Sequence, residues 1–128
     1  MTEVAAALIE KDGRFLIARR PANKSNALLW EFPGGKKEAG ETLGEALMRE
    51  CREELDAAVS VGEVFFETVH EYPDITVHLT LFRCRLISND VTCVEHAEMA
   101  WVTASELDSY TFCPADKEIL EKLRREYR

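Results

Sequence analysis

The first twenty positions hold two short hydrophobic runs separated by a turn signal. Residues 4–9 form one apolar run, Asp12 and Gly13 form the turn signal, and residues 14–19 form a second strand-like run. Two such runs joined by a short Asp-Gly connection predict a β-hairpin at the start of the chain. The following stretch RRPANKSNALLW, residues 19–30, is typical of a loop.

The pattern changes to a helical period after residue 42. Thr42 followed by Glu45 is a capping box, and no proline interrupts residues 43–55. At 100° per residue, Leu47 and Leu55 fall on one apolar stripe of this segment. The sequence therefore predicts a helix of about three and a half turns that packs through this stripe.

The second half of the chain combines strands with a terminal helix. Thr103 and Glu106 repeat the capping-box pattern before a short helix, and residues 115–127 carry an apolar stripe. The alternation of predicted strands and helices indicates a mixed α/β fold. The length and the 46% hydrophobic residues fit one compact domain, residues 1–128. The segments rich in β-branched and aromatic residues, which predict strands, are 57–61, 64–70 and 76–87.

Composition narrows the classes of function. A formal net charge of −8 argues against binding a nucleic acid polymer, because phosphate backbones require a basic face. No apolar run approaches the roughly 20 residues of a membrane span, and the N-terminus lacks a signal-peptide pattern. We expect a cytoplasmic protein with no membrane partner. Its cysteines form no C-x-x-C pair and are expected to be reduced thiols: Cys51, Cys84, Cys93 and Cys113.

Three glutamates of the predicted helix, Glu50, Glu53 and Glu54, fall on one arc beside its apolar stripe. Like charges three or four positions apart cost about 0.2–0.5 kcal/mol per pair. A divalent cation such as Mg²⁺ or Mn²⁺ reverses this repulsion and also binds phosphates. Gly34 and Gly35, just upstream, let the backbone approach such a ligand. The alternative is an ordinary solvated acidic face.

Together these residues resemble the Nudix box, G-x5-E-x7-R-E-U-x-E-E-x-G-U, in which U is aliphatic. Asp56 stands where the box has glycine, and Cys51 and Ala57 fill aliphatic positions. Aspartate tolerates the left-handed conformation that can end a helix, so we expect the helix to end normally. The residues that match the box, over 35–57, are Gly35, Glu41, Arg49, Glu50, Glu53 and Glu54.

Further stretches resemble the MutT branch of the Nudix hydrolases, especially its bacterial CTP pyrophosphohydrolases. They are LWEFPGGK, the pair Arg19-Arg20, the pair Glu95-His96 six residues before Trp101, and FCPAD. The resemblance implies an α/β/α sandwich around a central mixed β-sheet. It also implies metal-dependent hydrolysis of a nucleoside triphosphate to the monophosphate and pyrophosphate, as part of nucleotide-pool sanitation and DNA repair.

The substrate is left open among several nucleotides. Cytidine-type substrates (CTP, dCTP, 5-methyl-dCTP) or oxidised nucleotides are expected, and a strict 8-oxo-dGTP diphosphatase is the alternative. A non-catalytic nucleotide sensor is the alternative from a different class, and the intact glutamates of the box argue against it. Neither a monomer nor a homodimer is favoured.

The resemblance also assigns the metal site and the catalytic residues. Mg²⁺ is the expected cofactor, with Mn²⁺ as a substitute. The general base is either Glu53 or Glu95, and Arg49 orients the glutamates by charge-assisted hydrogen bonds. The metal ligands are the carbonyl of Gly35 and the side chains of Glu50, Glu53, Glu54 and Glu95; the catalytic set is Glu53, Glu50, Glu95 and Arg49.

Substrate contacts are expected from five residues. Lys36 and Arg20 are the natural phosphate contacts, although each also fits a surface charge. Asp116 occupies the place where MutT has an asparagine that contacts the base. Ionised, it suits an amine such as N4 of cytosine; protonated, it suits an oxidised guanine. Phe32 and His78 are expected to line the base pocket, or else to be ordinary sheet residues.

Overall fold

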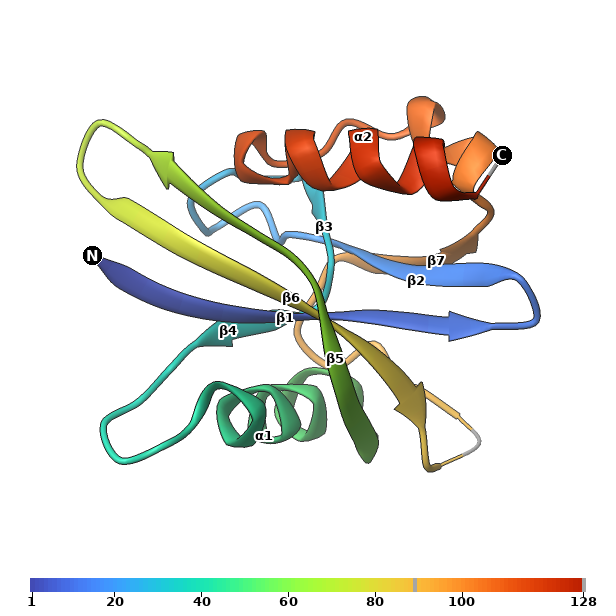
Figure 1. Cartoon of the computed structure of the whole chain (residues 1–128), viewed down its shortest axis with the longest axis horizontal. Helices are drawn as coiled ribbons and strands as arrows, with labels where there is room; N and C mark the ends of the chain where they lie inside the picture. The colour runs from blue at the N-terminus through green and yellow to red at the C-terminus, as the bar shows by residue number, and fades with distance from the viewer. Residues whose placement is uncertain (89, 128) are drawn as a thin grey trace.

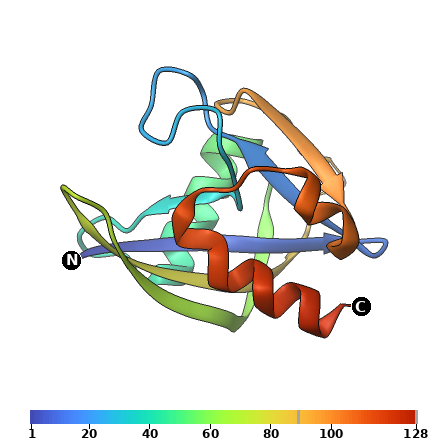
Figure 2. The ribbon, with the colours of Figure 1, turned by 90° about the horizontal axis from the view of Figure 1, so that it is seen from above.

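The computed structural model describes residues 1–88 and 90–127. A twisted sheet lies between two helices, α1 (Leu43–Leu55) and α2 (Lys117–Glu126), which cover opposite faces (Figure 1). Figure 2 shows α2 lying across the sheet when the molecule is seen from above. Two short 3₁₀ helices, Ala104–Ser109 and Pro114–Asp116, precede α2. No helix among the described residues has the length and apolar character needed to cross a membrane.

The sheet has the strand order β3-β2-β1-β6-β5, with β4 paired to β1 and β7 paired to β2. Strands β1 and β6 run parallel and the other pairs are antiparallel, so the expected mixed sheet is confirmed. The strands are β1 (Thr2–Lys11), β2 (Arg14–Arg19), β3 (Trp30–Glu31), β4 (Gly34–Lys36), β5 (Val59–Glu71), β6 (Thr76–Leu86) and β7 (Glu98–Val102).

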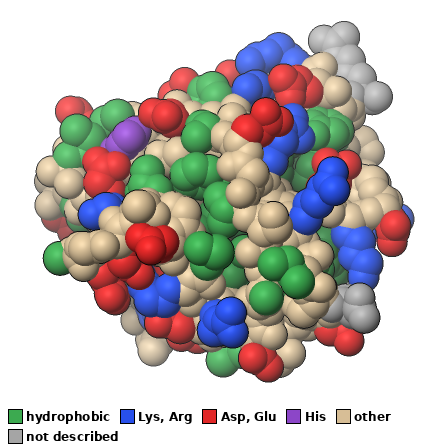
Figure 3. All heavy atoms as spheres, turned by 60° about the horizontal axis from the view of Figure 1, so that its bottom comes forward, with side chains coloured by type: hydrophobic (Ala, Val, Ile, Leu, Met, Phe, Trp, Pro, Cys, Tyr) green, Lys and Arg blue, Asp and Glu red, His purple; other side chains and the backbone are tan. Residues whose placement is uncertain are grey.

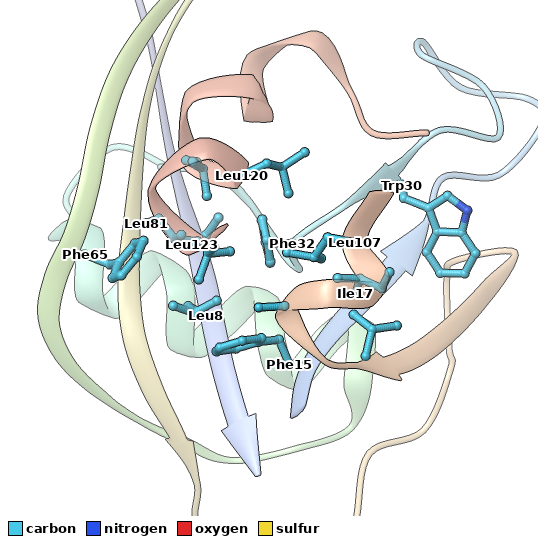
Figure 4. Close-up of a cluster of buried hydrophobic side chains, with 14 of the residues drawn as sticks. Leu8, Phe15, Ile17, Trp30, Phe32, Phe65, Leu81, Leu107, Leu120 and Leu123 are labelled. Carbon is cyan, nitrogen blue, oxygen red and sulfur yellow. The ribbon is translucent and has the colours of Figure 1, made fainter. Parts of the chain in front are cut away.

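Alternation along β1 divides the core into two layers. Ala6 and Leu8 pack toward α2, whereas Ala5, Ala7 and Ile9 pack toward α1. Figure 4 shows the α2 layer, where side chains from both sheet and helix meet. Full burial of a side chain such as Leu8 contributes about 1.5–3 kcal/mol. The sheet is therefore held from both faces, which fixes the position of α1.

Helix α1 has the predicted bounds and the predicted cap. The Oγ1 atom of Thr42 accepts a hydrogen bond from the Glu45 amide at 3.1 Å, and a Glu45 carboxylate oxygen accepts one from the Thr42 amide at 2.8 Å. The helix ends at Asp56, whose φ of 48° and ψ of 44° are left-handed. The substitution of the box glycine by aspartate therefore keeps the turn that the glycine serves.

Several strands differ from the prediction. Residues 59–61 and 64–70 of the two predicted segments belong to one strand, β5, whereas residues 57 and 58 precede it. Register shifts beside Val64 accompany its pairing with β6. The glycine pair upstream of the box helix belongs to β4, where a Cβ on Gly34 would collide with the Ala5 carbonyl. Strand β7 was not predicted from its sequence. The four cysteines are free thiols, as expected.

The left-handed helix end predicts a difference between two substitutions. Asp56→Ala should lower the free energy of unfolding by about 1 kcal/mol, because alanine lacks the tolerance of aspartate for this conformation. Asp56→Gly should leave it unchanged or higher, since glycine adopts positive φ without strain. Urea unfolding of the two variants and the wild type measures both effects. Equal stability of the Ala and Gly variants would contradict this reading of the turn.

A second prediction concerns pH. Nδ1 of His78 lies 2.7 Å from a Glu3 carboxylate oxygen and Nε2 lies 3.3 Å from one of Glu67, and the hydrogen bond with Glu3 raises the pKa of His78. The stabilisation is present in full below about pH 6.5, the unfolded value, and is lost as pH rises through the raised pKa. The stability difference between wild type and His78→Gln should therefore shrink in urea unfolding from about pH 5.5 to pH 8.5. A difference that grows over this range would refute the pairing.

Candidate active site

Three segments meet at the C-terminal half of α1. The Gly34 amide of β4 donates a hydrogen bond to a Glu54 carboxylate oxygen at 3.3 Å. The Thr92 amide donates to the Leu55 carbonyl at 2.7 Å, and the Val94 amide donates to the Glu54 carbonyl at 3.1 Å. These bonds satisfy carbonyls that the last helical turn leaves open. The segment before β7 is thereby attached to the box helix, and Glu95 follows directly.

The most unusual feature of the site is a pair of carboxyl groups. Glu54 is 7% exposed, and the carboxyl group of Glu50 lies close enough to act on its pKa. Desolvation, and then the charge of Glu50, raises the pKa of Glu54 to about 9. A Cβ added to Gly35 would collide with the Glu50 carboxyl, so the backbone of β4 lies directly against the pair. Two hard-oxygen side chains beside a bare backbone suit a divalent cation.

Arg49 organises the remaining glutamates of the box. Its guanidinium lies 2.7 Å from a Glu41 oxygen, 2.9 Å from one of Glu50 and 3.3 Å from one of Glu53. The hydrogen bond from Arg49 holds the pKa of Glu41 down at about 2. The Arg49 guanidinium also donates a hydrogen bond to the Lys36 carbonyl at 3.1 Å, which ties α1 to the end of β4. The orienting role expected of Arg49 fits these contacts.

The three glutamates predicted to converge do not all do so. Glu50 and Glu54 meet, whereas Glu53 is half exposed and pairs with Arg49 one turn earlier. Within residues 1–88 and 90–127, no three His, Cys, Asp or Glu side chains are already grouped closely enough to hold a metal ion. The sequence placed the three glutamates on one side of the helix, but it could not show that Arg49 pairs with Glu53.

Two hollows lie beside Gly34, next to the carboxyl pair, and share part of their lining. The smaller, about 40 Å³, is lined by Gly34, Glu54, Glu95 and His96. The larger, about 430 Å³, lies on the α2 side of the sheet. Arg20, Glu31 and Gly34 line both. Glu95, which is distant in sequence, therefore lies beside the box glutamate Glu54, as the resemblance implied.

Four of the five predicted substrate residues line the larger cavity: Arg20, Phe32, Lys36 and Asp116. Phe32 is 3% exposed and packs against Phe112 with ring centroids 5.6 Å apart. Asp116 is 4% exposed, and burial, followed by the charge of Glu31, raises its pKa well above the ordinary value. The cavity thus has an aromatic wall, a buried carboxyl group and, in Lys36, a cation at the end of β4.

Arg20 is more engaged than a simple phosphate contact. Its Nε donates to the Ser25 carbonyl at 2.7 Å, and its Nη1 lies 3.1 Å from a Glu31 carboxylate oxygen. The side chain therefore holds the loop after β2 against β3. Its assignment as a phosphate ligand is weakened, because these partners already use several of its five N–H donors.

His78 is placed differently from the prediction that it lines the base pocket. Its neighbours Val77 and Leu79 line the larger cavity, whereas His78 pairs with Glu3 and Glu67. Side chains alternate along β6, so His78 faces the α1 side of the sheet. These contacts fit the alternative expectation, an ordinary sheet residue, rather than a place in the base pocket. The face on which a strand residue lies depends on register, which a local pattern does not give.

Some cavity residues were not predicted to have a role. Glu31 and His96 stand in the quoted stretches LWEFPGGK and EH, but only the fold shows that they touch at 2.9 Å. Tyr72 lines the cavity from the turn between β5 and β6. Its pKa is raised, chiefly by burial. A tyrosine at a hairpin end carries no signal of such a role, because its partners come from distant segments.

Charged side chains are arranged differently on the surrounding surface and at the site. Figure 3, which brings the α1 side forward, shows acidic and basic side chains interspersed around hydrophobic ones. A depression of about 600 Å³ lies away from the box, beside the turn between β1 and β2. Its Arg83 is paired with Glu63 and Glu126, each at 3.4 Å. This depression therefore lacks the convergent, partly buried carboxyl groups found at α1.

Comparison with known proteins agrees with this arrangement. Residues 4–122 match the family model for the NUDIX domain. The CTP pyrophosphohydrolase of Escherichia coli (strain K12) is 40% identical over 121 residues, which are 94% of this chain and 90% of that protein. The 8-oxo-dGTP diphosphatase of Haemophilus influenzae is 30% identical over 125 residues, 97% of this chain and 92% of that protein.

Structural comparison gives the same family. A MutT protein from Methanosarcina mazei Go1 has a TM-score of 0.87 at 30% identity, and the match covers 98% of this chain and 94% of that one. Nudix hydrolases generally use divalent metal ions, in keeping with the carboxyl pair at Gly35. Because the family model spans most of the sequence and the box residues surround one site, this chain belongs to the Nudix hydrolase family.

Proposed function

We propose that this protein hydrolyses nucleoside triphosphates to nucleoside monophosphates and pyrophosphate, with Mg²⁺ as cofactor and Mn²⁺ as a substitute. The observation that carries the proposal is the contact between Glu50 and Glu54 against the bare backbone of Gly35. The 430 Å³ cavity shares Gly34 and Gly35 with this site. A polyphosphate leaving the cavity along β4 would therefore reach the carboxyl groups.

The metal ligands proposed are the Gly35 carbonyl, Glu50, Glu53, Glu54 and Glu95. When bound, Mg²⁺ supplies charge neutralisation for the phosphates and lowers the pKa of a bound water. Arg49 positions Glu50 and Glu53 through its guanidinium. Lys36, exposed at the end of β4, binds phosphate oxygens. Arg20 also places a positive charge at the cavity, although its main role is to hold the surrounding loop through the Ser25 carbonyl.

The proton acceptor for the attacking water is either Glu53 or Glu95. Both side chains are accessible, Glu53 on the outer side of α1 and Glu95 beside the small hollow. A general base must keep its carboxylate within hydrogen-bond reach of the water. The half-exposed position of Glu53 supports its movement toward substrate, so Glu53 is the first to test.

We propose cytidine-type triphosphates as the preferred substrates, with Asp116 at the base edge and Phe32 against the base. The relative with the higher identity of the two described above is a CTP pyrophosphohydrolase. A carboxyl oxygen of Asp116 accepts a hydrogen bond from N4 of cytosine. The proposed setting is a cytoplasmic protein, residues 1–128 forming one domain, that removes unwanted nucleotides as a monomer or homodimer without binding nucleic acid or membrane.

One observation favours a second candidate, an 8-oxo-dGTP diphosphatase. Burial raises the pKa of Asp116, which favours a neutral carboxyl group with one O–H donor as well as an acceptor. That form suits an oxidised guanine, as the sequence already suggested. A relative with this activity in its name is 30% identical.

Removing the proposed base should abolish most activity. Glu53→Gln should lower kcat by about 100-fold or more, because the amide accepts no proton. Since Glu53 is half exposed, the Tm should stay close to that of the wild type. Glu121→Gln, at an exposed position of α2, is the matched control and should retain full activity. Near-normal turnover by Glu53→Gln would eliminate Glu53 as the base, and the same measurement on Glu95→Gln then tests the other candidate.

A substrate panel separates the two candidate functions. Pyrophosphate release from CTP, dCTP, 5-methyl-dCTP, 8-oxo-dGTP and the other canonical triphosphates should give the highest kcat/KM with a cytosine nucleotide. Asp116→Ala should reduce that preference by roughly 10-fold or more, as expected when a base-reading hydrogen bond is lost. Preference for 8-oxo-dGTP over every cytosine nucleotide would reverse the order of the candidates. Absence of pyrophosphate release with every nucleotide and either metal would overturn the function itself.

A further inference from the structure

Tyr72 stands in the wall of the larger cavity, at the turn between β5 and β6. Its amide donates a hydrogen bond to the Ile75 carbonyl at 2.8 Å, which closes the turn. The imidazole ring of His70 packs edge to face against the phenol ring, with centroids 4.5 Å apart. Both Tyr72 and Ile75 line the cavity of about 430 Å³. The turn and the packed histidine therefore hold the phenol ring in the cavity wall.

The groups around the phenol oxygen of Tyr72 belong to the same cavity. Burial raises the pKa of Tyr72, whereas the Ala115 backbone and the Asn26 side chain lie close enough to lower it. Asp116 raises this pKa through its charge. Asn26, Ala115 and Asp116 all line the cavity with Tyr72. The hydroxyl group therefore lies where the cavity segments meet, between the loop after β2 and the residues before α2.

Asp116 brings to this place a carboxyl group without a partner. The side chain is 4% exposed, and it does not cap α2 although the residue stands at the start of that helix. No hydrogen bond or ion pair joins this carboxyl group to the part of the chain that the structure describes. Of the described side chains, those of Thr80 and His96 hold the fully enclosed polar atoms that lack a partner, so the Asp116 oxygens reach open space in the cavity. A ligand in the cavity would supply the missing partner.

A phenol beside a carboxyl group matches one edge of cytosine. A carboxyl oxygen accepts a hydrogen bond from the N4 amine, and a phenol donates one to the lone pair of the neighbouring N3. Uracil presents the reverse order, because its O4 accepts and its N3 carries a hydrogen. The raised pKa of Tyr72 keeps the phenol hydrogen in place at neutral pH. The two groups together therefore distinguish an amine-bearing edge from a keto edge.

We propose that Tyr72 is a specificity-determining residue that selects a cytosine base together with Asp116. Its hydroxyl group donates a hydrogen bond to N3 of the base, and Asp116 receives the N4 amine. His70 and the Ala115 backbone hold the phenol in position, and Asn26 links it to the loop after β2. This inference rests on the proposed function and adds to it a residue that rejects uracil.

Two substitutions separate reading of the base from support of the cavity wall. Tyr72→Phe removes the hydroxyl group and keeps the ring that packs against His70. Asn26→Gly removes the neighbour of the hydroxyl group in the loop, and glycine adopts the φ of 53° at this position without strain. Tyr127→Phe is the matched control, because it removes a phenol hydroxyl that accepts from Arg83, outside the larger cavity.

The test measures kcat/KM for CTP and UTP with Mg²⁺, together with the dissociation constants of CMP and UMP by calorimetry. Tyr72→Phe should lower the ratio of kcat/KM for CTP over UTP about 5- to 10-fold, as expected for the loss of one base-reading hydrogen bond. Its preference for CMP over UMP should fall by a similar factor. Asn26→Gly should change the values for both bases alike, and Tyr127→Phe should keep the wild-type ratio. Thermal unfolding establishes that each variant is folded at the assay temperature.

The outcomes distinguish this inference from the proposed function. If the wild type hydrolyses CTP and Tyr72→Phe changes the values for CTP and UTP by the same factor, or changes neither, the role of Tyr72 alone fails. A wild type that distinguishes neither CTP from UTP nor CMP from UMP overturns that role as well. If no triphosphate releases pyrophosphate, yet CMP binds more tightly than UMP and Tyr72→Phe removes this preference, the proposed function fails and the base-reading role of Tyr72 stands.

Discussion

The contact between the carboxyl groups of Glu50 and Glu54 is the constraint around which the site is built. Two such groups meet at the edge of a core only if a proton or a cation lies between them. Burial of Glu54 makes the repulsion strong, and the raised pKa of its carboxyl expresses that cost. Gly35 has no side chain to keep β4 away, so the backbone of β4 and the Glu50 carboxyl group come together. A divalent cation turns this costly arrangement into a favourable one.

The rest of the site follows from holding that pair in place. The capping box fixes where α1 begins, and the left-handed turn at Asp56 fixes where it ends. The segment before β7 bonds to the last carbonyls of the helix and delivers Glu95 to the same edge. Arg49 pairs with several carboxylates at once, which offsets the repulsion among the glutamates of the box in a chain with a net charge of −8. Phosphate binding is thus a local property that the overall charge does not oppose.

In the larger cavity, burial acts on a single carboxyl group, that of Asp116. Asp116 is almost fully enclosed, and Glu31 adds a negative charge nearby, so the neutral carboxyl group is favoured. A neutral acid both donates and accepts, so at the proposed base site selectivity would depend on the shape and partners of the surrounding wall. Tyr72, Arg20 and Glu31 belong to that wall. The lining of this cavity is therefore drawn from segments that meet only in the folded chain.

The sequence by itself determined the box helix, its cap, its left-handed end and the order of the charged positions along it. These features depend on interactions within about four residues, which a local pattern records in full. Glu50 and Glu54 were expected on one arc, and the family resemblance brought Gly35 to them. The resemblance also put Glu95 at the site, although nothing in its local pattern would have done so.

Only the tertiary structure decided the remaining features. Pairing with β1 made a strand of the glycine pair, and the register of β6 turned His78 away from the cavity. Arg49 pairs with Glu53 on the exposed side of α1, and the fold brings Glu31 to the ring of His96. Strand register, burial and the partners of a charge are set by segments far apart in the chain, and no local period carries that information.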